Sequence, residues 1–216
     1  MVPHRDIKAF YDRMGRGEDW WSIFGDKAID DLVRHGAFDS ARAICELGCG
    51  TGRLAARLLR DHLARDCHYL GLDLSTTMVR LAQKRLWPWS DRAAVVQVDA
   101  APDIPLADGA FDRFIATYVI ELFEHDEALA VMSEAHRILG KSGLACLTSL
   151  GQAQTPMSRL VCDLWNRIYT WRPTLVGGCR PIALETIINS NDWSVNHHGV
   201  TVRWGVPCEI VVAERL

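Results

Sequence analysis

The sequence predicts a single α/β domain over residues 1–216, with a mainly parallel sheet of seven strands and helices on both faces. Short apolar stretches alternate with amphipathic ones between residues 43 and 149, and parallel neighbours require such helical crossovers. Three glycines at alternate positions follow the first apolar stretch. Only four residues separate the last two apolar stretches, 194–203 and 208–213, so these two strands must pair as an antiparallel hairpin that closes the sheet.

The first strand leads into a glycine-rich turn. Apolar residues 43–45 are followed by an acid, Glu46, and then by Gly48, Gly50 and Gly52. An amphipathic helix begins directly afterwards. Strand, glycine turn and helix together form the geometry that brings backbone N–H groups close to a nucleotide-like ligand. Side chains at the glycine positions would block that approach.

The other elements follow in order. Strands are expected at 68–73, 94–99, 111–117 and 144–149, with helices at 53–62, 76–85 and 126–139 between them. Outside this region, helices are expected at 6–13, 26–35, 156–169 and 182–189. The single domain therefore divides into an N-terminal helical cap (1–39), a ligand-binding core (40–150), a helical insert (151–192) and a closing β-hairpin (193–216).

Composition excludes several classes of protein. A net charge of −3 gives no electrostatic footprint for nucleic acid. The longest apolar runs, such as 210–213, are far too short for a membrane span. The N-terminus has no apolar signal-peptide core, and seven irregularly spaced cysteines favour reduced thiols, which predicts a cytoplasmic protein. Cys45 and Cys49 flank the glycine turn without a second pair, so no metal site is expected.

Acidic residues stand at the carboxyl ends of three successive strands. They are Glu46, Asp73 and Asp99. In an open parallel sheet, ligands bind beyond these strand ends. A carboxylate after the second strand can accept both hydroxyls of a ribose, and one after the third can accept the exocyclic amine of adenine. The three acids and the glycine turn therefore predict an adenosine site.

The identity of the adenosine compound is less strongly indicated by these residues. Residues 50–55 can be aligned with the dinucleotide fingerprint. Glu46 ahead of the glycines, the position of Asp99 and the closing hairpin all argue against NAD, and no residue set for hydride transfer can be named. An NAD-dependent oxidoreductase is therefore a distant alternative.

The motifs resemble those of a known family. The first, Glu46-Leu-Gly-Cys-Gly-Thr-Gly52, is similar to motif one of class I S-adenosylmethionine-dependent methyltransferases. The resemblance covers about residues 40–150 and implies a Rossmann-like fold with a reversed seventh strand. Residues 69–73 resemble the second motif of the family, and residues 97–100 resemble the third. Residues 105–112 and 134–143 resemble the subgroup that includes ubiquinone and menaquinone biosynthesis methyltransferases.

The resemblance implies S-adenosyl-L-methionine as cofactor and S-adenosyl-L-homocysteine as product. Gly48 and Gly50 of the 46–52 turn, with the backbone near Glu46 and Cys49, would border the methionine part. Asp73 would hold the ribose. The adenine would pack on Leu74 and Met78, with its amine bound by Asp99 and its ring nitrogen by the N–H of Ala100.

The resemblance also places the methyl-donor end of the cofactor. Thr117 and Tyr118, just past the fourth strand, would face it. Tyr11 is expected either to close over the cofactor or to pack in the core. No catalytic base is assigned, although Tyr118, Glu121 and His125 lie where one could sit, and His125 is better explained as a helix-start residue.

The expected acceptor is a small, hydrophobic molecule: a quinol, phenol, amine or lipid head group. The sequence after Thr117 lacks the Asn/Asp-Pro-Pro-Tyr pattern of nucleic-acid and protein amide methyltransferases. Glu121 and Trp165 are the expected acceptor contacts. The apolar stripe of 156–169 is either a lid over the acceptor or core packing, and three nearby arginines would suit peripheral contact with a membrane. A regulatory module that binds the cofactor without turnover is the second alternative.

Overall fold

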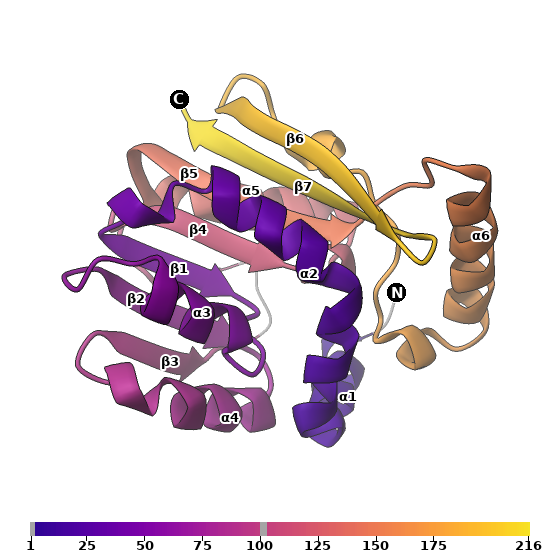
Figure 1. Cartoon of the computed structure of the whole chain (residues 1–216), viewed down its shortest axis with the longest axis horizontal. Helices are drawn as coiled ribbons and strands as arrows, with labels where there is room; N and C mark the ends of the chain where they lie inside the picture. The colour runs from indigo at the N-terminus through magenta and orange to yellow at the C-terminus, as the bar shows by residue number, and fades with distance from the viewer. Residues whose placement is uncertain (1–2, 100–102) are drawn as a thin grey trace.

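A computed structural model describes residues 3–99 and 103–216. It confirms the predicted fold class: one seven-stranded sheet in the order β3-β2-β1-β4-β5-β7-β6 (Figure 1). Strands β3, β2, β1, β4 and β5 are parallel, and β7 is antiparallel to both β5 and β6. The strands are β1 (Ala43–Leu47), β2 (His68–Asp73), β3 (Ala93–Gln97), β4 (Phe111–Thr117), β5 (Leu139–Leu150), β6 (Trp193–Arg203) and β7 (Val206–Arg215).

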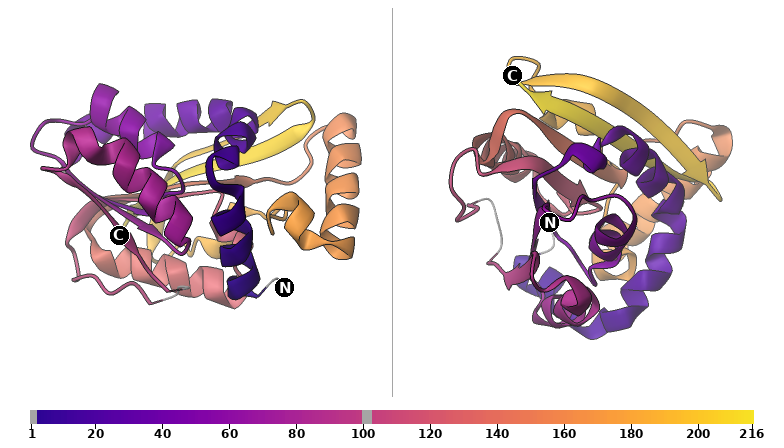
Figure 2. Two further views of the ribbon diagram at one scale, coloured as in Figure 1. Left: turned by 90° about the horizontal axis from the view of Figure 1, so that it is seen from below. Right: turned by 60° about the vertical axis from the view of Figure 1, so that its left-hand side comes forward.

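Helices cover both faces of the sheet, as Figure 2 shows. Side chains alternate along a strand, so Ile44 of β1 joins the apolar cluster under α2, α3 and α4, whereas Cys45 joins the cluster under α5. The two clusters form two cores, one on each side of the sheet. The helices are α2 (Glu18–His35), α3 (Arg53–Asp61), α4 (Thr76–Leu86) and α5 (His125–Ile138).

Two predicted helices differ from the structure, and strand β5 begins at Leu139 rather than at residue 144. Helix α2 begins at Glu18 rather than near residue 26. The helix expected at 182–189 is wrong, because the structure has only a single 3-10 turn there, η6 (Leu184–Ile187). The reason is that Ile182 N donates to Leu150 O (2.9 Å) and Leu184 N donates to the Glu209 carboxylate (2.9 Å). These bonds hold the backbone against the sheet, and tertiary contacts override the helical pattern.

Helix α2 is fixed to the sheet at its carboxyl end. The buried guanidinium of Arg113 in β4 donates to the carbonyl oxygens of Gly36 (2.8 Å) and Ala37 (2.7 Å), which follow the helix. His197 of β6 also lies 2.9 Å from the Asp31 carboxylate of α2. The sheet therefore determines where α2 lies, including the part of the helix that adjoins the site described below.

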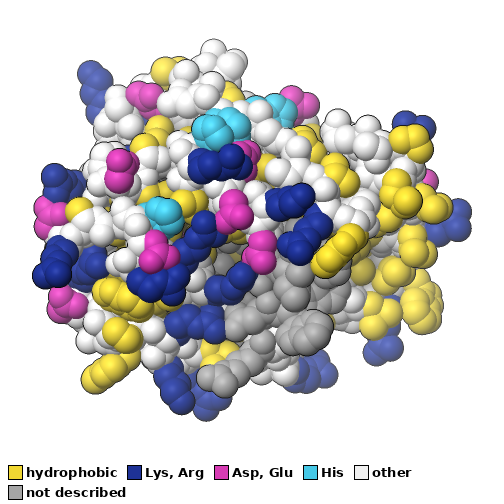
Figure 3. Space-filling model, in the orientation of Figure 1, with side chains coloured by type: hydrophobic (Ala, Val, Ile, Leu, Met, Phe, Trp, Pro, Cys, Tyr) yellow, Lys and Arg dark blue, Asp and Glu magenta, His cyan; other side chains and the backbone are white. Residues whose placement is uncertain are grey.

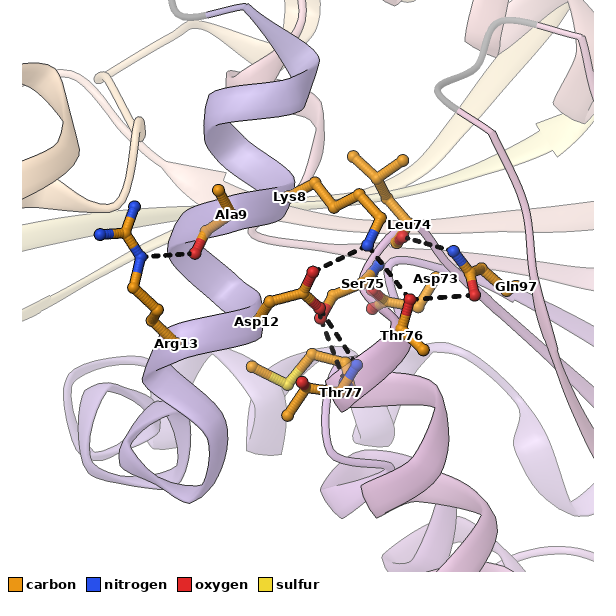
Figure 4. A network of polar contacts seen from close by, with 11 residues as sticks. Lys8, Ala9, Asp12, Arg13, Asp73, Leu74, Ser75, Thr76, Thr77 and Gln97 are labelled. Atoms are coloured by element: carbon orange, nitrogen blue, oxygen red, sulfur yellow. Dashed lines mark hydrogen bonds and ion pairs between the residues drawn. The ribbon is translucent and has the colours of Figure 1, made fainter.

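Helix α1 (His4–Met14) is held against the start of α4 by one carboxylate (Figure 4). Asp12 accepts hydrogen bonds from Lys8 Nζ (2.7 Å), Ser75 Oγ (2.5 Å) and Thr77 N (3.1 Å). Burial raises the pKa of Asp12, but these donors outweigh it and lower the pKa to about 2. The carboxylate therefore stays ionised at neutral pH and fixes α1 over the end of β2.

The apolar side chains of helix α6 (Pro156–Trp171) do not form one continuous stripe: some face the core and others face the solvent. Thr155 and Ser158 form a capping box at its start. Val161 and Trp165 pack against the main core. Other apolar side chains of the helix are exposed, and Figure 3 shows this apolar surface over α6 at the right: Met157, Leu160, Leu164 and Trp171. None of the helices within the described ranges is long and apolar enough to cross a membrane.

Candidate functional site

A cavity of about 730 Å³ lies along the carboxyl ends of the parallel strands. It extends from the end of β3 past β2, β1 and β4 to the end of β5 and the start of β7. The structure brings most of the predicted site residues together in its lining: Tyr11, Glu46, Gly48, Cys49, Gly50, Asp73, Leu74, Met78, Asp99, Thr117, Tyr118, Glu121 and Trp165.

Two predicted positions lie outside this lining, and a third cannot be placed because it is not among the described residues. Gly52 does not line the cavity; it precedes α3 with a left-handed backbone and lies against Ala82. Ala100 lies outside the described residues. His125 is exposed at the start of α5 and is absent from the lining, in agreement with its interpretation as a helix-start residue.

The glycine turn is packed too closely for side chains. Gly48 has φ of 69°, and a Cβ there would lie 2.2 Å from Val119 Cγ2. Its N–H donates to Leu72 O (2.8 Å), which joins the turn to β2. Gly50 has φ of 52°, and its N–H donates to Asp73 Oδ2 (2.9 Å). At these two positions the turn therefore presents backbone to the cavity.

Asp73 is buried at the end of β2, with 9% of its surface exposed. Its Oδ1 accepts from Ser75 N (2.8 Å) and its Oδ2 from Gly50 N. Burial raises the pKa of this carboxyl, while the two N–H donors act in the opposite direction. Each carboxylate oxygen can accept a second hydrogen bond, so Asp73 can brace the glycine turn and still bind ligand hydroxyls.

Glu46 is also fixed from behind. It is 1% exposed, and its Oε2 accepts from the hydroxyl of Tyr69 (2.5 Å) in β2. Burial and the neighbouring Glu46 charge raise the pKa of Tyr69 well above its usual value, so the phenol remains a donor. A partner in the neighbouring strand, which no local sequence pattern indicated, therefore fixes the orientation of the Glu46 carboxylate.

The opposite end of the cavity contains a buried carboxyl that is incompletely bonded. Glu121 Oε2 has no hydrogen-bond partner within the described ranges. Glu121 lies in the 3-10 turn η4 (Ile120–Leu122) and is 1% exposed; its other oxygen, Oε1, accepts from Leu150 N (3.2 Å). Burial raises the pKa of Glu121 to about 8. An incompletely bonded carboxyl in a cavity is typical of a ligand-binding site.

The wall over this end comes from distant parts of the chain. Tyr11 Oη of α1 lies 3.5 Å from Gly177 O, and Trp165 Nε1 of α6 donates to Cys179 O (2.9 Å). Sequence reasoning missed Cys179 and Cys208, which also line the cavity. None of the seven cysteines, all of which lie in the described ranges, forms a disulfide bond. Cys179 lies in an irregular segment and Cys208 in β7, and an isolated cysteine carries no periodic signal that could have identified it as a cavity residue.

Comparisons with known proteins identify the family. Residues 44–143 match the family described as "Methyltransferase domain". The chain is 27% identical over 161 residues to a 2-phytyl-1,4-naphtoquinone methyltransferase of Nostoc punctiforme, covering 74% of this chain and 67% of that protein. It is 23% identical to the ubiquinone/menaquinone biosynthesis C-methyltransferase UbiE of Rhizobium johnstonii, covering 64% of this chain and 54% of that protein. These matches support a class I S-adenosylmethionine-dependent methyltransferase domain over residues 44–143.

Solved structures share the fold of this methyltransferase. The N-methyltransferase NodS of Bradyrhizobium japonicum, solved with S-adenosyl-L-homocysteine, superposes with a TM-score of 0.71 at 16% identity over 97% of this chain and 98% of that one. The [4+2]-cyclase SpnF superposes with a TM-score of 0.69 at 18% identity over 88% and 81%. Since one of the two is a cyclase, the fold alone does not determine the reaction.

The residues present fit S-adenosyl-L-methionine, the cofactor of the family. The glycine turn presents backbone to the cavity, and Asp73 retains acceptor capacity for ribose hydroxyls. Met78 supplies an apolar surface, and Asp99 follows β3 where an adenine amine would need an acceptor. No metal ligand is required for this fit.

Proposed function

We propose that this methyltransferase transfers a methyl group to a small, hydrophobic acceptor: a quinol, phenol, amine or lipid head group. The supporting observation is that the cavity continues past Thr117 into a region walled by Leu150, Trp165 and Val176. Apolar walls with few polar groups are typical of sites for small organic ligands. The name of the Nostoc punctiforme relative, which refers to a phytylated naphthoquinone, is consistent with such an acceptor.

The proposed cofactor contacts follow the position of each residue in the cavity. Gly48, Gly50 and the backbone at Glu46 and Cys49 would border the methionine part. Asp73 would bind the ribose. The adenine would be bound by three lining residues, Leu74, Met78 and Asp99, and by Ala100, which lies outside the described residues. The cofactor supplies an activated methyl group, so the protein mainly has to align the acceptor and exclude water.

A thermal-shift titration tests the cofactor site. S-adenosyl-L-homocysteine should raise the melting temperature, because a ligand that binds only the folded state stabilises it by mass action. NAD at the same concentration should have little effect. A shift with NAD and none with S-adenosyl-L-homocysteine would overturn the proposal. A methyl-transfer screen over phenols, quinols, amines and phospholipid head groups then separates an enzyme from a module that binds the cofactor without turnover.

Trp165 tests whether α6 contributes to the acceptor site. Its indole packs partly against the core and lines the cavity, so Trp165→Ala should impair use of the acceptor more than binding of S-adenosyl-L-homocysteine. The measurements are KM for any acceptor found in the screen and cofactor affinity by calorimetry. Trp171→Ala is the matched control, because this exposed residue of the same helix does not line the cavity. A large loss of stability, about 3–5 kcal/mol as for a buried Trp, with turnover preserved would show that Trp165 is only packing.

A further inference from the structure

We propose that Glu121 is the catalytic residue that takes the proton of the acceptor, and that the acceptor presents a neutral hydroxyl, as in a phenol or quinol, on an apolar body. This inference rests on the proposed function and specifies its acceptor. It starts from the carboxyl of Glu121 at the far end of the cavity, whose Oε2 has no hydrogen-bond partner among the described residues.

The geometry fixes one oxygen of Glu121 and leaves the other available. Oε1 accepts from Leu150 N at the end of β5 (3.2 Å), which holds the carboxyl at the cavity wall. Oε2 is fully buried and has no partner in the described part of the chain. A buried carboxylate oxygen without a hydrogen-bond donor costs free energy. The hydroxyl of a methyl-accepting molecule that enters the cavity would supply that donor and remove the cost. When Glu121 is ionised, its free oxygen therefore selects a ligand that carries a hydrogen-bond donor.

The groups around Glu121 are neutral. Tyr118, Cys179 and Cys208 are the titratable groups that interact with it electrostatically. Burial raises the pKa of each, to about 11 for Cys208, so all three stay protonated at neutral pH. No Lys or Arg contributes to the pKa shift of Glu121 among the described residues, so no cation pairs with this carboxyl, although basic side chains such as His4 and Arg53 line other parts of the cavity. An uncharged acceptor fits best.

Tyr118 positions this end of the cavity. Its φ of 56° is unusual for a bulky residue, and such strain concentrates at functional sites. The strained backbone follows directly after β4, and Tyr118 N donates to Thr148 O (2.9 Å). The side chain lies against α2, where a Cβ at Gly25 would come within 2.4 Å of Tyr118 Oη. Gly25 therefore gives the phenol space beside Glu121.

The proton transfer balances without a further reactant. The O–H bond of the acceptor breaks, its proton moves to Glu121 Oε2, and the electron pair stays on the acceptor oxygen. That oxygen forms a bond to the methyl carbon while the carbon–sulfur bond breaks and its electron pair returns to sulfur. A carboxyl whose pKa lies near neutrality suits a base for this step. Only the ionised form of Glu121 can act.

The test uses binding rather than turnover. The protein saturated with S-adenosyl-L-homocysteine is titrated with β-naphthol, and with β-methoxynaphthalene, which has the same body and no hydrogen to donate. Wild-type protein should prefer the naphthol, and the preference should rise about tenfold between about pH 6 and about pH 8.5, as Glu121 ionises and accepts a stronger, charge-assisted bond. Glu121→Gln should remove that rise, whereas the exposed control Glu185→Gln should keep it.

Three results would overturn the inference. One is equal affinity for the two probes, and another is an unchanged pH dependence in Glu121→Gln. The third is tighter, Glu121-dependent binding of naphthylmethylammonium, which would make the acceptor a cationic amine. If Glu121→Gln fails to fold, Glu121→Leu provides the same comparison without a buried polar group. Failure of S-adenosyl-L-homocysteine to bind would instead overturn the proposed function, so the two failures are distinguishable.

Discussion

Replacing Glu121 by Gln should stabilise the fold, and increasingly so as the pH rises. The carboxyl is fully buried, and burial raises its pKa from 4.5 to about 8. Between these two values the folded state keeps a proton that the unfolded state has lost, so wild-type stability falls as the pH rises through this interval. Gln has no proton to lose. The gain in free energy of unfolding should approach about 3–5 kcal/mol above pH 8, at about 1.4 kcal/mol for each pKa unit.

Chemical denaturation of both proteins at about pH 5 and about pH 8.5 measures this difference. Near pH 5 the two proteins should have similar free energies of unfolding. Glu121 is then protonated in the folded state, and the pH is close to the pKa of 4.5 that the carboxyl has in the unfolded state. Glu185→Gln is the control, since an exposed carboxylate should change stability by less than about 0.5 kcal/mol at either pH. A difference between wild type and Glu121→Gln that does not vary with pH would show that Glu121 is ionised in the folded protein throughout.

Asp73→Ala should weaken the binding of S-adenosyl-L-homocysteine by at least tenfold. The carboxylate would form charge-assisted hydrogen bonds to two ribose hydroxyls, and loss of such bonds costs about 1.5–3 kcal/mol. The same substitution removes the acceptor of Gly50 N and Ser75 N, so the melting temperature should also fall. Calorimetry well below the melting temperature separates the two effects.

Asp112→Ala is the matched control for that measurement. Asp112 also accepts a backbone hydrogen bond, from Arg42 N (2.7 Å), but it lies in β4 and does not line the cavity. Its loss should reduce stability and leave affinity unchanged. If Asp73→Ala behaves like Asp112→Ala, the ribose role is wrong and the carboxylate only braces the turn.

Sequence patterns predicted the features that depend on neighbouring residues. The glycine turn and the acids at 46, 73 and 99 could be read directly, because strand ends and tight turns have local chemical signatures. The closing hairpin was predictable for the same reason: so short a connection permits only an antiparallel pair.

Features built from distant residues could not be predicted in this way. The bond from Ser75 to Asp12 crosses 63 positions, and no periodicity encodes it. The false helix at 182–189 had an acceptable pattern, but hydrogen bonds to β5 and Glu209 determine its backbone. Glu121 was named from its position after β4, yet its burial and its free oxygen follow only from the packing of β5 and β7 around it.

The two ends of the cavity differ in how the chain builds them. The glycine turn, Asp73 and Asp99 come from one continuous stretch of about fifty residues, whereas Tyr11, Trp165 and Cys179 come from opposite ends of the sequence and meet only in the folded state. Substitutions in this second group of residues would therefore leave the hydrogen bonds of Asp73 to Gly50 N and Ser75 N in place. Such a division makes the protein evolvable: acceptor preference can drift through scattered changes while the same methyl donor is retained.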